Sequence, residues 1–290
     1  MKLSIITINY NGSRNTLNLL KSLQDQTDKD FEIIVVDNAS EEADFDNLKQ
    51  EIGRAILVKN DSNLGFSGGN NVGIRKAFEN GADWLVLLNN DTWVESGFIS
   101  TVKASLEAKE GLVGLPIVED GQTAYAGKIE WLKAPSDLVH LYTHKATLVS
   151  NIYVIGACLC VEKSVFNMIG FLDEKYFLYF EDTDFSVRAK RAGLAITILE
   201  KPKVNHQVSA TTKKLGSPML LRYHYRNALY FNWKNGPWFI KLAVWPWSFW
   251  IIKKQVFKII VRYKSNESRA ILNGVFDLYR NKMGQIGQNQ

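Results

Sequence analysis

Apolar and polar positions alternate in blocks along the first 90 residues. Four apolar runs have the length of β-strands, at residues 3–8, 31–36, 55–58 and 84–88. Leucines at helical spacing predict a helix from Ser13 to about Leu23, and a second helix is expected from about Asn70 to Glu79. Repeated strand–helix units of this kind predict an α/β fold around a mainly parallel, doubly wound sheet.

Three of these strands end in polar residues, at Asn9, Asp37 and Asn89–Asp91. The carboxyl ends of parallel strands meet at one edge of a sheet, so these residues are expected to converge on one crevice. A carboxylate at Asp91 suits a hard divalent cation, with the Asn89 amide nearby, although Asn and Asp also favour simple turns. Asp37 suits either a hydrogen bond to a base or ribose, or a helix cap.

The second half contains a strand at residues 156–161, a short helix at Lys163–Ile169 and then a run of aromatic and acidic residues. A further helix is expected near Asp184–Ala192. Glu181, Asp182 and Asp184 stand at its N-terminal end, where the helix dipole stabilises acids, so helix capping is one explanation for them. The aromatic residues 176–180 are expected to limit solvent access to the first acid and so tune its basicity.

The composition is that of an ordinary globular protein. The chain has 290 residues, of which 46% are hydrophobic and 22% charged, so disordered and fibrous classes are excluded. Cys158 and Cys160 are two residues apart in an apolar run and form no structural zinc site by themselves, which fits a reducing cytoplasm. The first apolar run is too short for a signal peptide. A cytoplasmic protein is expected.

The charge is unevenly distributed. Thirteen Lys or Arg and no Asp or Glu lie between Lys201 and Asn266, so the remainder holds 35 − 13 = 22 basic against 30 acidic residues. Five of the eight tryptophans lie in the same region. Basic and aromatic residues together suggest a membrane surface, or nucleic acid, although no nucleic-acid recognition motif accompanies them.

The basic region is not expected to cross a membrane. Its longest uncharged stretch between Trp238 and Lys264 is Leu242–Ile252, eleven residues, whereas a spanning helix needs about 20. Pro246 is expected to bend or interrupt a helix there. Two interpretations remain: a helix pair lying on an anionic membrane surface, or a helical hairpin packed on the body of the protein or at a dimer interface.

Phosphate-binding loops of the usual kinds are missing. No G-x-G-x-x-G follows the first strand, and no G-x-x-x-x-G-K-[ST] occurs anywhere. A phosphorylated ligand must therefore be held in another way. A cation on Asp91 would supply the charge that such a loop provides elsewhere.

Three motifs, in this order, resemble glycosyltransferase family 2 and specifically its rhamnosyltransferase-like branch. They are the loop 63–70 (NLGFSGGN), the strand ending at 89–91 (NND) and the run 156–193. The resemblance covers roughly residues 2–209 and implies a GT-A fold. It also implies a nucleotide-activated sugar as donor and an inverting transfer. We expect a GT-A glycosyltransferase domain at residues 1–212 and a basic, Trp-rich helical region at residues 213–290.

The same resemblance implies roles for individual residues. Asp91 corresponds to the last acid of the family's metal motif, which binds Mg²⁺ or Mn²⁺ on the donor diphosphate; Asn89 replaces the first acid, and His206 matches a histidine that completes the metal site. Asp182 resembles the general base, with Glu181 in support. The implied acceptor side consists of Gly156, Ala157, Asp184 and Arg188. The implied donor-binding residues are Asn9, Tyr10, Asp37, Asn63, Gly68, Asn70, Asn89 and Asn90.

The sequence leaves donor and acceptor open. The branch points to dTDP-L-rhamnose, but relatives that use UDP-hexoses, UDP-galactofuranose or UDP-N-acetylhexosamines share these motifs. Residues 119–148 are expected to form part of an acceptor wall for a saccharide or lipid-linked saccharide of bacterial-type cell-surface polysaccharide. The competing classes are a sugar-phosphate nucleotidyltransferase, a non-catalytic nucleotide-sugar or membrane-surface binding module, and a nucleic-acid binder.

Overall fold

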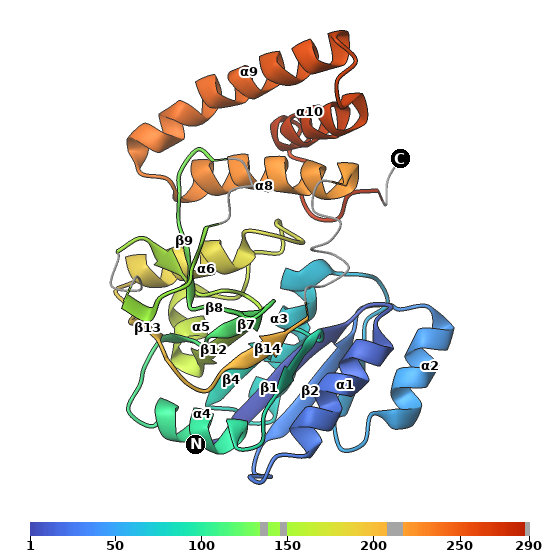
Figure 1. Ribbon diagram of the computed structural model, residues 1–290, viewed down its shortest axis with the longest axis vertical. Helices are drawn as coiled ribbons and strands as arrows, with labels where there is room; N and C mark the ends of the chain where they lie inside the picture. The colour runs from blue at the N-terminus through green and yellow to red at the C-terminus, as the bar shows by residue number, and fades with distance from the viewer. Residues whose placement is uncertain (134–138, 146–149, 208–216, 288–290) are drawn as a thin grey trace.

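The computed structural model describes residues 1–133, 139–145, 150–207 and 217–287, arranged as an α/β body with a helical layer above it (Figure 1). The predicted boundary between residues 212 and 213 lies outside these residues. The body is built on a sheet of seven strands in the order β13-β6-β12-β4-β1-β2-β3. Their bounds are β1 Leu3–Asn9, β2 Glu32–Asp37, β3 Ile56–Lys59, β4 Trp84–Leu88, β6 Leu112–Gly114, β12 Cys158–Glu162 and β13 Ile196–Ile198.

The sheet is mixed but mainly parallel. Strands β3, β2, β1 and β4 run parallel, and β13 runs parallel to β6. Strand β12 is antiparallel to both of its neighbours, β4 and β6. The four parallel strands place Asn9, Asp37 and the residues after Leu88 at one edge, as the strand pattern predicts. This edge faces the helical layer (Figure 1).

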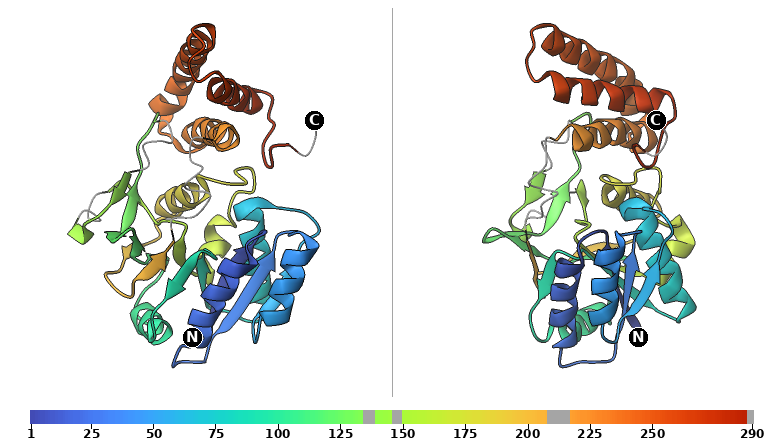
Figure 2. Two further views of the ribbon diagram at one scale, coloured as in Figure 1. Left: turned by 45° about the vertical axis from the view of Figure 1, so that its right-hand side comes forward. Right: turned by 90° about the vertical axis from the view of Figure 1, so that its right-hand side faces the viewer.

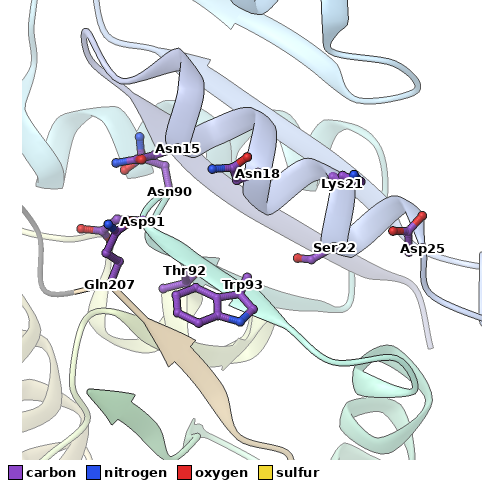
Figure 3. Close-up of a pocket in the computed structure, with 10 residues that line it drawn as sticks. All are labelled: Asn15, Asn18, Lys21, Ser22, Asp25, Asn90, Asp91, Thr92, Trp93 and Gln207. Atoms are coloured by element: carbon purple, nitrogen blue, oxygen red, sulfur yellow. The ribbon is translucent and has the colours of Figure 1, made fainter. Parts of the chain in front are cut away.

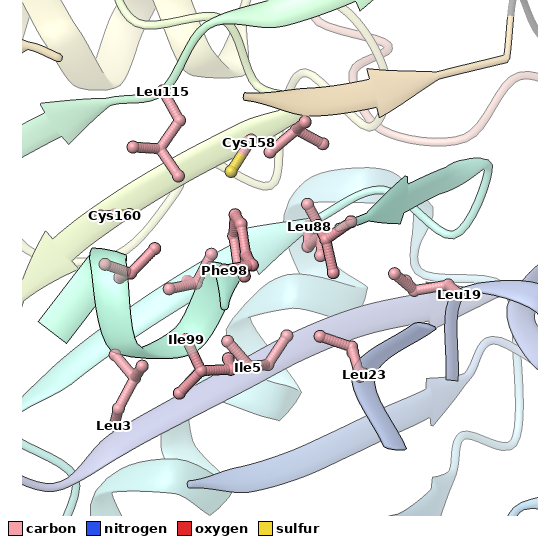
Figure 4. Packing of buried hydrophobic residues seen from close by; sticks show 14 of the residues in the cluster. Leu3, Ile5, Leu19, Leu23, Leu88, Phe98, Ile99, Leu115, Cys158 and Cys160 are labelled. Atoms are coloured by element: carbon pink, nitrogen blue, oxygen red, sulfur yellow. The ribbon is translucent and has the colours of Figure 1, made fainter. Parts of the chain in front are cut away.

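Helices cover both faces of the sheet because its central strands are apolar on both sides. One face packs against α1 (Ser13–Gln24), α2 (Glu42–Glu51) and α4 (Phe98–Leu106), as Figure 4 shows for part of this core. The other face packs against α3 (Gly65–Glu79), α5 (Lys163–Ile169) and α6 (Glu181–Arg191). Cys158 and Cys160 are free thiols buried in the first of these cores.

Two small sheets lie beside the main one. The first has the order β5-β14-β7-β8, and the second β10-β9-β11. Their bounds are β5 Thr92–Val94, β7 Ile117–Glu119, β8 Gln122–Ala124, β9 Ala126–Lys128, β10 Val139–Leu141, β11 Ile152–Tyr153 and β14 Val204–His206. Strand β14 is antiparallel to β5, with His206 opposite Thr92. This pairing returns a late segment of the chain to the end of β4.

Three helices form the outer layer, α8 (Pro218–Asn235), α9 (Trp238–Ile260) and α10 (Ser265–Tyr279), and α9 lies farthest from the sheet in two views (Figures 1 and 2). Asp277 of α10 accepts two hydrogen bonds from Arg222 of α8, at 2.6 and 3.0 Å. At Gly274 a side chain would meet the Arg222 carbonyl oxygen at 2.4 Å, so the glycine permits the close approach of α10 to α8.

Three helices differ from their expected extent. Helix α3 begins at Gly65 rather than near Asn70: the loop-like glycines lie inside it, where Gly73 allows contact with Ile6 of the sheet. Helix α6 begins at Glu181, ahead of the expected Asp184. Helix α9, of 23 residues, continues through Pro246, so Pro246 does not interrupt it. Among the described helices, none is long and apolar enough to cross a membrane.

Candidate active site

The ends of β1 and β2 are held together by buried side chains. Asn9 Nδ2 donates to Asp37 Oδ2 at 2.9 Å and to Asp44 Oδ2 at 2.9 Å, while its Oδ1 accepts from Thr16 Oγ1 at 2.8 Å. The Ser40 amide donates to Asp37 Oδ1 at 3.0 Å. Asn9 therefore positions Asp37. Carboxylate oxygens accept more than one hydrogen bond, and the contact of Asp37 with a nucleotide stays a prediction.

The loop before α3 is ordered around Asn38, which sequence reasoning did not single out. Its Nδ2 donates to Asn63 Oδ1 and to the Gly65 carbonyl, both at 3.0 Å. Its Oδ1 accepts from the Leu64 amide at 3.1 Å. The predicted donor-loop residues Gly68 and Asn70 lie in the first turns of α3, and the Asn70 side chain donates to the Phe66 carbonyl of its own helix.

Asp91 and His206 are in contact although 115 residues separate them. His206 Nε2 donates to Asp91 Oδ1 at 2.9 Å, and its Nδ1 donates to Glu119 Oε1 on β7. Burial alone would lower the pKa of His206, but these two carboxylates raise it to about 9. The hydrogen bond from His206 in turn lowers the pKa of Glu119. From the sequence, Glu119 was expected only as part of the acceptor wall.

Asp91 and His206 supply two of the ligands that a divalent cation would need. Asp91 offers a carboxylate oxygen and His206 an imidazole nitrogen, and these face each other. Across the part of the chain that the structure describes, no group of three His, Cys, Asp or Glu is arranged to hold a metal ion. A cation there would therefore need further ligands from a diphosphate or water, and His206 would have to release a proton to bind it.

Asp182 lies at the start of α6, against the loop that precedes β12. Its Oδ2 accepts from the Gly156 amide at 2.9 Å, and a side chain at Gly156 would come within 3.1 Å of that oxygen. Its Oδ1 accepts from the Thr183 amide at 2.6 Å. The carbonyl of Ala157, the residue after Gly156, accepts a hydrogen bond from the Asn89 amide at 3.0 Å. The predicted base and the predicted metal motif are thus joined through two residues.

The two neighbouring carboxyls differ in environment. Glu181 is buried, and its Oε2 has no hydrogen-bond partner among the described residues. Burial, and then the charge of Asp182, raise the pKa of Glu181 well above its usual range. Burial also raises the pKa of Asp182, against the hydrogen bonds from Gly156 and Thr183. Glu181 therefore holds a proton more tightly than Asp182, whose carboxylate is stabilised by two backbone hydrogen bonds.

The aromatic segment before these acids has an unusual backbone. Phe177, Tyr179 and Phe180 have φ angles of 63°, 71° and 76°, in the left-handed region that side chains disfavour. Asn227 of α8 holds this segment, because its Nδ2 lies 2.9, 2.7 and 3.2 Å from the carbonyl oxygens of Tyr176, Leu178 and Tyr179.

A second amide and a ring contact add to this support. Asn71 of α3 donates to the Leu172 carbonyl at 2.9 Å and accepts from the Leu172 amide at 3.1 Å. The ring of His224 stacks on Tyr179 with centroids 3.9 Å apart. Burial lowers the pKa of His224 to about 4, so the stacked ring is neutral. Helix α8 thus reaches from the C-terminal region into the segment that carries the acids.

Asp184 and Arg188, expected on the acceptor side, both bind other parts of the protein. Asp184 is fully buried and accepts from Arg188 Nε at 2.7 Å, Asn235 Nδ2 at 2.6 Å and Lys234 Nζ at 2.7 Å. Arg188 also donates to the carbonyl of Phe171 at 2.9 Å. The pair fixes α6 against α8 and against the segment before residue 176, and a direct contact with an acceptor stays a prediction.

The remaining predicted residues surround the same edge. Tyr10 is 51% exposed at the end of β1, so its ring is available to a ligand. Asn90 donates to Thr16 Oγ1 at 3.0 Å. Of the expected acceptor wall, residues 134–138 and 146–149 lie outside the described chain, and His140 lies on β10 with its ring 6.4 Å from that of Tyr142, centroid to centroid.

The fold and this site define a glycosyltransferase of the GT-A type, and comparison with known proteins gives the family. The sequence model of "Glycosyl transferase family 2" matches residues 4–165, and the chain belongs to that family. Within the family it is similar to dTDP-rhamnosyl transferase RfbF of Shigella flexneri, with 23% identity over 79% of each chain. It is also similar to N-acetylglucosaminyl-diphospho-decaprenol L-rhamnosyltransferase of Mycobacterium tuberculosis, with 22% identity over 81% of this chain and 86% of that one. These relatives fit the rhamnosyltransferase-like branch.

Solved structures share the fold at low identity. The mannosyltransferase PcManGT of Pyrobaculum calidifontis, in complex with GDP-Man and Mn²⁺, superposes with a TM-score of 0.60 at 13% identity, covering 97% of this chain and 87% of that one. Residues 1–349 of S. aureus TarS in complex with UDP-GlcNAc superpose with a TM-score of 0.59 at 15% identity, covering 97% of this chain and 81% of that one. The chain spans 40% of a longer TarS structure, with a TM-score of 0.54.

Proposed function

We propose that this glycosyltransferase moves a sugar, with inversion, from a nucleotide diphosphate donor to a saccharide or lipid-linked saccharide of bacterial-type cell-surface polysaccharide. The observation that carries the proposal is the position of Asp182, joined through Gly156 and Ala157 to Asn89 at the end of β4. A base and a donor-binding edge must lie this close for a single displacement.

Asp182 would take the proton of the acceptor hydroxyl as that oxygen attacks the anomeric carbon. In-line displacement requires the leaving diphosphate on the opposite face of the sugar, and inversion follows from that geometry. The raised pKa of Asp182, which burial causes, brings its basicity closer to neutral pH. The protonated Glu181 beside it would keep the local negative charge to one.

Asp91 and His206 would hold a divalent cation, Mg²⁺ or Mn²⁺, together with the donor diphosphate. Bound there, the cation would stabilise the charge that grows on the leaving group. PcManGT, whose structure contains Mn²⁺ and GDP-Man, supports the presence of such an ion in this fold. Glu119 would orient His206 through the other ring nitrogen, as is common for histidine ligands.

L-rhamnose from dTDP-rhamnose is the donor that the relatives favour, since two of them are named as rhamnosyl transferases. UDP-hexoses, UDP-galactofuranose and UDP-N-acetylhexosamines are the alternatives. A screen of purified nucleotide sugars, read out as release of nucleotide diphosphate, tests the proposal. Release from one donor supports it, whereas pyrophosphate release would indicate a nucleotidyltransferase. Donor binding without turnover on any acceptor would indicate a binding module.

Helix α9 would place the enzyme on the inner face of the cell membrane, as a cytoplasmic peripheral protein. Four large side chains at helical spacing on α9 are more than half exposed: Trp238 (74%), Leu242 (64%), Trp245 (60%) and Phe249 (58%). Lys253 and Lys254 lie over the rings of Phe249 and Trp250. Exposed tryptophans next to lysines fit the interface of an anionic bilayer, and a homodimer through these helices is the alternative.

A further inference from the structure

A groove of about 560 Å³ lies between α1 and β5 and extends from Asp91 along α1 to Asp25 (Figure 3). Its volume falls within the range of about 300–1,000 Å³ that is usual for ligand sites. It is lined by Asn15, Asn18, Lys21, Ser22, Asp25, Asn90, Asp91, Thr92, Trp93 and Gln207. Asn90 and Asp91, at one end, belong to the predicted donor and metal motif, but neither the family motifs nor the proposed transfer step accounts for the rest of the groove.

One wall is a polar stripe on α1. Asn15, Asn18, Ser22 and Asp25 recur every three or four residues, so they lie along one side of the helix. From Asn15 to Asp25, which caps the end of α1, the stripe covers ten residue steps, about 15 Å at 1.5 Å per residue. The opposite side of α1 is buried in the core. The groove is therefore elongated and exceeds the length of a single sugar ring.

The other wall is dominated by Trp93. Strand β5 alternates between buried Thr92 and Val94 and exposed Trp93, so the pleat directs the tryptophan ring away from the core. The ring is 47% exposed and projects from β5 toward the groove (Figure 3). An aromatic face of this kind packs well against the apolar C–H face of a sugar ring.

Three polar side chains of the groove are available to a ligand. The side chains of Asn15, Asn18 and Gln207 have no hydrogen bond to another residue in the described chain. Amides both donate and accept, as sugar hydroxyls do, so the two groups match. The charges of Lys21 and Asp25 are opposite, and the groove has no cluster of basic side chains to attract a phosphorylated chain.

We propose that this groove is a carbohydrate subsite that binds neutral sugar units of the acceptor glycan beyond the unit that reacts. The inference rests on the proposed function, because it assumes that the acceptor is a saccharide. Trp93 supplies the packing surface, and Asn15, Asn18 and Gln207 supply hydrogen bonds to hydroxyls. An acceptor of several sugars then gains affinity with length, which a single-sugar site does not allow.

Binding of soluble oligosaccharides tests the subsite without turnover. The probes are oligomers of one to four sugars that contain rhamnose, N-acetylglucosamine, glucose or galactose, measured by calorimetry and by saturation-transfer NMR on full-length protein. The expected result is an affinity that rises with length and falls about 3- to 10-fold in Trp93→Ala, the loss typical of one aromatic contact. Asn18→Ala is expected to weaken binding as well.

Trp233→Ala is the matched control, since Trp233 is 53% exposed but lies on α8. It is expected to bind the oligosaccharides as the unaltered protein does, and all three variants are expected to hydrolyse donor at the unaltered rate. Equal binding by Trp93→Ala and the unaltered protein, or binding of none of the probes, overturns the subsite. Trp93-dependent binding in a protein that transfers no sugar upholds it and overturns the proposed function instead.

Discussion

The side-chain amide of Asn227 lies 2.7 Å from the carbonyl oxygen of Leu178, only four residues before Asp182. Through this contact a helix near the end of the chain positions the segment that carries the candidate base. Phe177, Tyr179 and Phe180 in that segment have left-handed backbone conformations, which are unfavourable for residues other than glycine. These conformations therefore depend on contacts from outside the segment.

Asn227→Ala is expected to lower kcat and leave the KM for the donor nearly unchanged. The variant leaves three carbonyl oxygens without their donor, and an unsatisfied buried group costs about 1–3 kcal/mol, so the free energy of unfolding is expected to fall as well. A shift in the acid limb of the pH–rate profile is expected, because Asp182 moves. Asn232→Ala is the control: Asn232 is a buried amide of the same helix that binds the Leu132 amide and the Ala228 carbonyl instead of the segment. An equal loss of kcat in both would contradict a positioning role.

Asp182→Asn is expected to lose about 10²- to 10⁴-fold in the rate of transfer, the usual contribution of a general base. The amide keeps the shape of the carboxylate, so donor affinity is expected to change by no more than a few fold. Single-turnover kinetics with equilibrium donor binding measures both. Near-normal turnover would show that another group takes the proton.

Chelation of divalent cations is expected to stop transfer, with recovery on adding Mg²⁺ or Mn²⁺. Asp91→Ala is expected to remove both the activity and the recovery, because it deletes the carboxylate that faces His206. Donor affinity with and without the cation, followed by calorimetry, separates loss of metal binding from loss of folding. Full activity of the chelated protein would exclude the metal role of this pair.

Glu181→Gln is expected to stabilise the protein at pH 8 and to have less effect near pH 5. The folded state holds the Glu181 proton more tightly than the unfolded chain does, because burial raises its pKa. The group therefore opposes folding increasingly as pH rises above the unfolded pKa, about 4.3. Thermal unfolding at a series of pH values measures the difference. A difference independent of pH would show that Glu181 is ionised in the folded protein.

Full-length protein is expected to co-sediment with anionic liposomes, less so at high salt. Replacing Trp238, Leu242 and Phe249 together by Ser is expected to abolish this, because they are three of the four large exposed side chains at helical spacing on α9. Met168→Ser, at a 58% exposed position on α5, is the control. The alternative is an interface between two copies. It would be favoured if the triple variant sediments with liposomes as before, while analytical ultracentrifugation shows a dimer for the unaltered protein and a monomer for the variant.

Reversal of the charge on Lys253, Lys254 and Lys258 tests the electrostatic part separately. Each lysine near anionic lipid contributes about 1 kcal/mol, so the triple change to Glu is expected to weaken binding strongly and to remove its salt dependence. Neutral liposomes serve as the comparison. Point changes are preferable to truncation here, because α10 covers α8 and α8 supports the segment before Asp182.

Periodicity was sufficient for the parts of the fold that depend on local burial. The strands at residues 3–8 and 84–88 are uncharged or nearly so because both of their faces are covered, and the polar residues after them lie at one edge as predicted. The predicted start of α3 was wrong because glycines in a sequence are typical of loops. Here they serve the close approach of a helix to Ile6 and Ile8 of the sheet, a requirement that only packing reveals.

Motif order and hydrophobic spacing are local properties of the chain, so they were sufficient to predict the family, the mainly parallel sheet and the residue types that gather at its edge. Which side chains meet depends on the packing of the whole chain. The pairing of β14 with β5 sets His206 against Asp91, and the packing of α8 sets Asn227 against Leu178. Such contacts join residues far apart in the sequence, so they depend on strand register and helix packing, which no local pattern encodes.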